Sequence, residues 1–140
     1  MSATSSSLPI RYLLDTNICI YVINARPPAV LARFVAHEVD GLGISAITAS
    51  ELYWGVCKSG SVRNRTTLEK FLSPLAVLDY DLGAAQKYGE LRAYLEQQGT
   101  PIGPFDQQIA AHALALDITL VTNNRREFAR VPGLRLENWV

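Results

Sequence analysis

Short apolar runs alternate along the chain with longer segments in which apolar residues recur every three or four positions. The short runs predict buried strands and the longer segments predict amphipathic helices. The expected strands cover residues 12–14, 42–46, 75–78, 118–121 and 134–137. Between them we expect a helix capped near 15–17, and further helices at about 28–35, 48–59, 63–72, 84–98, 106–114 and 126–128.

Strands separated by helices indicate a parallel sheet, because parallel neighbours need long crossover connections. The predicted fold class is therefore α/β, a sandwich in which helices cover both faces of a sheet of about five strands. No internal repeat or linker interrupts the pattern. We expect one domain over residues 10–140, preceded by a loose Ser-rich tail over residues 1–9.

The composition is that of a globular protein of one domain, with 140 residues, 49% of them hydrophobic and 19% charged. The formal net charge is zero, which argues against a protein that merely coats nucleic acid. Cys19 and Cys57 fit no zinc motif and are expected to be reduced, buried thiols. There is no signal-peptide pattern and no run of roughly 18 apolar residues, so we expect no membrane association and a cytoplasmic location.

Acidic side chains stand at the carboxyl ends of the expected strands, where open parallel sheets bind their ligands. Asp15 follows the first strand, Glu51 lies in the first helical turn after the second, and Asp106 begins the helix that leads into the fourth. Three carboxylates packed together repel one another unless a cation compensates. Oxygen ligands of this kind suit Mg²⁺ or Mn²⁺ rather than zinc, so the pattern predicts a divalent metal site able to hold a phosphate.

Each acid also has a simpler interpretation. Asp15 and Asp106 would serve as helix caps or first-turn acids, and Glu51 would be the partner of Thr48 in a capping box. All of these interpretations would have to hold at three strand ends at once, which favours a shared site.

Two other classes of protein compete with a metal-dependent enzyme. A phosphoacceptor signalling domain would use Asp79 or Asp81 after the third strand, but the paired acids after the first strand and the lysine after the last are missing. A non-catalytic α/β binding module would use the acids only as caps, and retained Mg²⁺ binding would count against it.

Several blocks of the sequence resemble the VapC toxins of the PIN-domain family. They are residues 14–17 (LDTN), 50–52 (SEL) with Gly55, 102–113 (IGPFDQQIAAHA), 120–124 (LVTNN) and pieces of 126–139. The resemblance covers almost the whole chain in the right order. It implies a PIN-like sandwich and a Mg²⁺-dependent endoribonuclease, the toxin of a type II toxin–antitoxin system. It further implies a homodimer, a VapB-type antitoxin as partner, and tRNA or another structured RNA as substrate.

The resemblance assigns catalytic and metal-binding roles to Asp15, Glu51 and Asp106. Many PIN domains carry a fourth acid, an aspartate, shortly after a Val-Thr pair, where this chain has Asn124. Glu127 lies three residues further on, on the same face of a helical turn. Either Glu127 or Asn124 is therefore expected to complete the set.

Hydroxyl groups next to the acids are expected to orient the site, namely those of Thr16, Thr48 and Thr122. His112 lies six positions after Asp106, about 240° around the helix, so the two side chains do not share a face. We therefore expect His112 to be structural rather than a general base.

Basic and aromatic residues lie close to the acids in the sequence. Arg125, Arg126 and Arg130 follow the predicted site directly and are candidates for phosphate contacts, with a solvated surface as the alternative. Tyr53 and Trp54 are expected to be core or interface residues rather than platforms on which RNA bases stack.

The expected reaction is metal-assisted hydrolysis of a phosphodiester bond. Carboxylates hold one or two metal ions, and water attacks the phosphorus in line with the leaving oxygen. The expected products carry 5′-phosphate and 3′-hydroxyl ends.

Overall fold

The computed structural model describes residues 9–140, so the predicted tail lies outside the described residues except for Pro9. The described chain forms a five-stranded sheet in the order β3-β2-β1-β4-β5, with every neighbouring pair parallel. The strands are β1 (Tyr12–Leu14), β2 (Leu42–Ser45), β3 (Ala76–Leu78), β4 (Thr119–Val121) and β5 (Leu136–Glu137). The predicted α/β class and strand number are confirmed.

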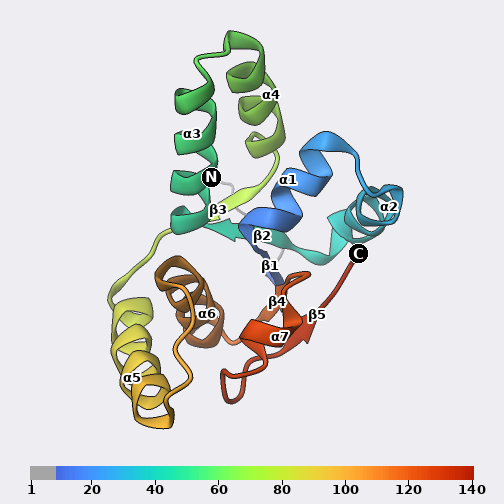
Figure 1. The fold of residues 1–140 in the computed structure, drawn as a ribbon. Helices are drawn as coiled ribbons and strands as arrows, with labels where there is room; N and C mark the ends of the chain where they lie inside the picture. The colour runs from blue at the N-terminus through green and yellow to red at the C-terminus, as the bar shows by residue number, and fades with distance from the viewer. Residues whose placement is uncertain (1–8) are drawn as a thin grey trace, which may run out of the picture.

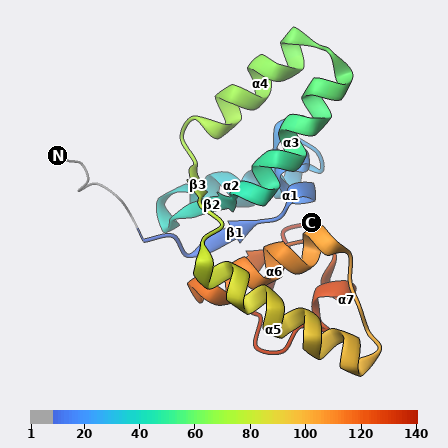
Figure 2. The same cartoon turned by 90° about the vertical axis from the view of Figure 1, so that its left-hand side faces the viewer.

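Helices cover both faces of this sheet, as Figure 2 shows from the side. One layer contains α1 (Thr16–Asn24), α2 (Pro28–His37), α3 (Ala46–Ser59) and α4 (Val62–Leu72). The other contains α5 (Leu82–Gln98), α6 (Pro104–Leu116) and α7 (Arg125–Phe128), and a short 3₁₀ turn, Glu38–Asp40, leads into β2. The antiparallel pair α3–α4 projects away from the sheet (Figure 1).

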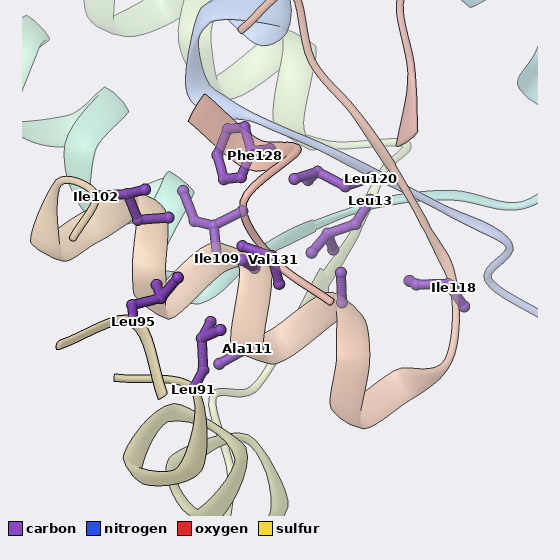
Figure 3. Close-up of a cluster of buried hydrophobic side chains, with 12 residues drawn as sticks. Leu13, Leu91, Leu95, Ile102, Ile109, Ala111, Ile118, Leu120, Phe128 and Val131 are labelled. Atoms are coloured by element: carbon purple, nitrogen blue, oxygen red, sulfur yellow. The ribbon is translucent and has the colours of Figure 1, made fainter. Parts of the chain in front are cut away.

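Two hydrophobic cores lie on opposite sides of the sheet because successive strand residues point to opposite faces. Leu13 and Leu120 belong to the core beneath α5 and α6, which Figure 3 shows in close-up. Their neighbours Leu14 and Val121 belong to the core beneath α1 to α4. This alternation explains why the central strands are apolar throughout.

The order of the strands reverses between β1 and β4. From β1 the chain proceeds through β2 to β3 on one side, and β4 then pairs with the free side of β1. The backbone N–H of Asp15 continues the pairing by donating to the carbonyl of Val121 at 3.0 Å. Such a reversal leaves a crevice at the carboxyl ends of the two strands, where ligands of this class of sheet bind.

The predicted capping box at Thr48 is wrong. Helix α3 begins at Ala46, directly after β2, and its cap is Ser45, whose Oγ accepts from the N–H of Ile47 at 3.1 Å. The earlier serine satisfies the helix terminus, so neither Thr48 nor Glu51 is needed there. Both side chains are left free for contacts outside their own helix.

The two cysteines are free thiols, as predicted. Cys19, on the buried side of α1, is fully buried, whereas Cys57 is exposed, so the prediction that both are buried is wrong for Cys57. Cys57 lies in the last turn of α3, where a guanidinium nitrogen of Arg65 on α4 donates to its sulfur at 3.8 Å.

Among residues 9–140, no single helix is long and apolar enough to cross a membrane. Helix α1 taken together with the segment Pro28–Asp40 meets the requirements of length and composition, but the two are bent by 104°. The apolar residues of α1 have another use in this fold, because Ile18, Cys19 and Val22 are core residues.

Candidate active site

Asp15 joins the ends of β1 and β4. Its Oδ1 accepts from the backbone N–H of Ile18 at 2.8 Å and thereby caps α1, as the simpler interpretation predicted. Its Oδ2 accepts from the hydroxyl of Thr122 at 2.5 Å. The side chain is buried, and this burial, together with the negative charge of Glu51, raises its pKa from 3.8 to about 6 despite these two hydrogen bonds.

Glu51 approaches from the neighbouring helix α3. Its Oε1 accepts from the hydroxyl of Thr16, the first residue of α1, at 2.6 Å. The hydroxyl of Thr48 lies 3.4 Å from that of Thr16 and is fully buried. The structure therefore brings the two predicted orienting threonines and the carboxylate of Glu51 into one group between α1 and α3.

Glu127 is held in place by two donors from different segments. The backbone N–H of Gly103 donates to its Oε1 at 2.8 Å, and the side-chain amide of Asn124 donates to its Oε2 at 2.9 Å. These donors stabilise the negative charge, with Gly103 dominant, and lower the pKa of Glu127. Asn124 thus presents its amide nitrogen to a carboxylate and acts to orient Glu127.

Asp106 lies in the first turn of α6 and faces Glu127. It is not the cap of that helix, because Gly103 occupies the cap position. Burial raises the pKa of Asp106 most, and the charges of Glu127 and Asp15, the hydrogen bond with Glu127 and the charge of Glu51 contribute in that order; together they raise it from 3.8 to about 7. In the absence of a cation, Asp106 therefore holds the proton of the hydrogen bond that it shares with Glu127.

The four carboxylates consequently belong to one cluster at the carboxyl edge of the sheet, since Asp106 senses the charges of the other three. The acids of the competing signalling-domain hypothesis lie elsewhere. Asp81 caps α5 by accepting from the N–H of Ala84 at 3.0 Å, beside the edge strand β3.

The hydroxyl of Thr122 connects two parts of this cluster. It donates to Asp15 and accepts from the backbone N–H of Asn124 at 2.9 Å. The chain leaving β4 is thereby tied to the carboxylate that follows β1. This places the Asn124–Glu127 turn opposite α6.

The predicted arginine cluster lies on the exposed side of α7. Arg125 and Arg126 are exposed and have no acidic partner among residues 9–140, whereas a guanidinium nitrogen of Arg130 donates to the carbonyl of Pro101 at 3.0 Å. Their position next to Glu127 leaves the first two available to a phosphate that approaches the carboxylates.

His112 is buried away from the carboxylates, as expected for a structural residue. Its Nδ1 lies 2.8 Å from the hydroxyl of Ser45, and Nε2 has no hydrogen-bond partner among the described residues. Burial lowers its pKa. The histidine therefore connects α6 to the start of α3.

Of the two places predicted for Trp54, the core is wrong, and a place in an interface stays a prediction. Tyr53 is half-buried against the core as expected, but Trp54 is 66% exposed on α3. A signal for this existed in the sequence, because Trp54 lies three positions after Glu51 and so shares its helix face.

The donor set fits a divalent cation in its chemistry. Among residues 9–140, no three acidic, histidine or cysteine side chains already surround one point at coordination distance. Instead, Asp106 is protonated, Glu51 accepts a hydrogen bond from Thr16, and Glu127 accepts one from the N–H of Gly103. Burial, together with the neighbouring negative charges, raises the pKa values of Asp15 and Asp106, and a cation that displaces the proton would offset both effects.

The raised pKa of Asp15 predicts how stability without metal depends on pH. The folded state holds this proton more tightly than the unfolded state, whose aspartate has its ordinary pKa of 3.8. The associated stability is therefore complete below about pH 4 and is lost as the pH rises through about 6, a change of about 3 kcal/mol. Urea unfolding in EDTA between pH 4 and 7.5 would measure it.

The matched variant is Asp15→Asn, because asparagine retains the helix cap but carries no charge. We expect its stability to fall less over this range than that of the wild type, by about the contribution of Asp15, because the raised pKa of Asp106 still acts in the variant. The exposed control Glu90→Gln should follow the wild type. Parallel pH curves for wild type and Asp15→Asn would contradict the prediction.

The fold agrees with comparisons with known proteins. The PIN-domain family model matches residues 12–134, so the chain belongs to the PIN-domain family. The chain is 47% identical over 131 residues to the tRNA(fMet)-specific endonuclease VapC of Shigella flexneri, covering 93% of this chain and 98% of that protein. It is 48% identical over 132 residues to ribonuclease VapC2 of Haemophilus influenzae, covering 94% and 99%.

A solved structure of similar sequence has the same fold as this chain. The crystal structure of DNA-bound VapBC from Salmonella typhimurium superposes with a TM-score of 0.86 at 45% identity, over 94% of this chain and 99% of that one. Within the PIN-domain family, this chain is thus one of the VapC ribonucleases. PIN nucleases generally use divalent metal ions.

Proposed function

We propose that this VapC ribonuclease is a Mg²⁺-dependent endonuclease of tRNA and the toxin of a VapBC pair, built as one domain over residues 10–140. The convergence of Asp15, Glu51, Asp106 and Glu127 at the switch point of the sheet carries the proposal. The tRNA(fMet)-specific relative at 47% identity supports the class of substrate. Mn²⁺ is the alternative metal, because it takes the same oxygen ligands.

The four carboxylates would hold the cation, and their partners keep them in position. Thr122 orients Asp15, Thr16 orients Glu51, and the N–H of Gly103 together with Asn124 orients Glu127. Glu127, rather than Asn124, supplies the fourth carboxylate in this proposal. When bound, the cation would supply Lewis-acid chemistry, lowering the pKa of water and offsetting charge on the phosphate.

Binding of a cation is coupled to the loss of a proton from Asp106. Its side chain holds this proton against Glu127 at a pKa of about 7 and releases it to solvent when positive charge arrives. Arg125, Arg126 and Arg130, exposed at α7, are placed to contact RNA phosphates beside the carboxylates. Release of that proton therefore accompanies assembly of the active site.

We further propose a VapB-type antitoxin, a homodimer and a cytoplasmic location. The similar Salmonella structure is a VapBC complex, which supports the partner. Two free thiols and a tRNA substrate fit a reducing cytoplasm. Co-expression with a neighbouring antitoxin gene tests the partnership, since failure of the two proteins to co-purify would contradict it, and light scattering of the free protein tests the dimer.

The test of the proposed activity is the chemistry of the RNA ends. Purified protein incubated with initiator tRNA and Mg²⁺ should produce discrete fragments with 5′-phosphate and 3′-hydroxyl ends, because water rather than the ribose is the nucleophile. Ligation-based sequencing distinguishes these ends from cyclic phosphates. An Asp106→Asn preparation controls for contaminating nucleases, and fragments of equal amount from both preparations would refute the proposal.

A further inference from the structure

A groove of about 760 Å³ lies between α1, α3 and α4 and begins at the active-site residues. Thr16 and Glu51, whose side chains hydrogen-bond to each other, form part of its wall. The groove is as large as sites that enclose small ligands. Helices α3 and α4, which form one side of the groove, project from the sheet (Figure 1).

Trp54 lines this groove and is 66% exposed. A tryptophan presents a large, rigid aromatic face, and one that is exposed beside a groove offers a surface on which a base can stack. The ammonium of Lys58 lies 4.8 Å from the centre of its ring, one helical turn further along α3. The indole is therefore positioned by a cation while much of its surface stays open.

The groove combines positive charge with polar amides. Arg63 lines it and, like Lys58, has no acidic partner among residues 9–140. The amides of Asn17 and Asn64 also line it, and each offers both donors and acceptors. Single-stranded RNA is recognised through such a combination of aromatic stacking, cationic phosphate contacts and hydrogen bonds to base edges.

Gly55 keeps the groove open beside Trp54. A Cβ placed at this residue would meet no atom within 4 Å, so packing does not demand a glycine there. In the middle of a helix glycine lowers stability relative to alanine. Gly55 therefore leaves space in the groove that a side chain would occupy.

We propose that the groove is a nucleotide subsite, in which an unpaired base of the RNA substrate stacks on Trp54 and flanking phosphates contact Lys58 and Arg63. This inference rests on the proposed ribonuclease function and adds to it a base-binding position on the α3 side of the carboxylates. The two cations match phosphate charge, and continuity with Glu51 places the bound nucleotide next to the scissile bond.

Fluorescence tests stacking directly, because the chain has only two tryptophans and Trp139 is buried. In the cleavage-deficient Asp106→Asn background, initiator tRNA and a short single-stranded RNA should quench the emission of Trp54. The same RNA with abasic nucleotides should bind with little quenching. Trp54→Phe should remove the quenching and retain most of the affinity, since phenylalanine also stacks.

Steady-state kinetics with initiator tRNA measure what the stacking contributes. Trp54→Ala should raise KM about 10-fold with kcat nearly unchanged, and Trp54→Phe should restore most of the loss. Gly55→Leu should fill the groove, raise KM similarly and leave thermal stability undiminished. Tyr94→Ala, which removes an exposed aromatic residue from α5, is the matched control and should leave KM unchanged.

The outcomes separate this inference from the proposed function. If the wild type cuts tRNA but Trp54→Ala and Gly55→Leu cut it with unchanged KM, the subsite is refuted and the activity stands. If these variants lose affinity only for the antitoxin, the groove belongs to that partner and the inference is likewise overturned. If the wild type neither cuts RNA nor shows quenching with it, both proposals fail.

Discussion

Replacement of Asp15, Glu51 or Asp106 by its amide is expected to lower the rate of RNA cleavage at least about 100-fold, because each would remove a charge that we propose holds the cation and stabilises the transition state. The three residues come from different segments but belong to one cluster, because the negative charges of Asp15 and Glu51 both raise the pKa of Asp106. Rates under single-turnover conditions, with Mg²⁺ in excess, would measure the loss.

The fold should survive these substitutions. Each amide retains the shape of the side chain, and removal of one negative charge relieves repulsion in the metal-free protein. Thermal unfolding in EDTA should therefore show an unchanged or higher midpoint. The exposed pair Glu90→Gln and Glu96→Gln on α5 provides controls with the same loss of charge and full activity. A variant of Asp15, Glu51 or Asp106 that cuts RNA at nearly the wild-type rate would remove that residue from the active site.

Glu127 and Asn124 are expected to differ in the same assay. Glu127→Gln removes the fourth carboxylate and should approach the loss seen for the other three acids. Asn124→Ala removes only one of the two donors that orient Glu127, since Gly103 still donates to it. We therefore expect the smaller effect at Asn124, and the reverse order would assign the fourth position to the asparagine.

Removal of metal is expected to abolish cleavage, whereas removal of the 2′-hydroxyl at the cut nucleotide should only slow it. The chain has two histidines, and His112 is buried against Ser45 away from the carboxylates. It therefore offers no histidine pair of the kind that activates a ribose hydroxyl. Hydrolysis by water does not require that hydroxyl, so a substrate with a single 2′-deoxy nucleotide should still be cut.

The measurement compares all-ribose and singly 2′-deoxy tRNA fragments with and without EDTA. Added Mg²⁺ or Mn²⁺ should restore cleavage of both, and Ca²⁺ should restore it poorly because its larger, looser coordination suits this geometry less. Isothermal titration of the metal-free protein provides a readout independent of activity. Fragments ending in a 2′,3′-cyclic phosphate and formed in EDTA would contradict this mechanism.

The elements of the fold could be predicted from the sequence because their signals are local. Apolar runs such as 12–14 and 118–121 are fully apolar or nearly so, as strands covered on both faces must be. Helical periodicity and turn residues such as Gly99 marked most helix ends within two or three residues. The positions of Asp15, Glu51 and Asp106 at strand ends likewise followed from the order of the elements.

The partners of those acids were decided by the tertiary structure. Thr122 donates to Asp15 across 107 positions of sequence, and Gly103 donates to Glu127 across 24. Ser45, directly after β2, provides the cap of α3. Glu51 is therefore not needed at the helix terminus, and its carboxylate faces Thr16 of α1 instead. The sequence places Thr48 and Glu51 at the spacing of a capping box. It does not show that α3 has already begun at Ala46, two residues before Thr48.

Exposure of Trp54 was the second matter that only the folded arrangement determined. The sequence alone does not distinguish a buried from an exposed Trp54. Helix α3 packs on the sheet at its start and then projects beyond it together with α4, so residues along the same helix have different surroundings. Periodicity determines which residues share a face of a helix. What covers that face depends on where neighbouring helices end, and here α1, α3 and α4 leave a groove beside the carboxylates.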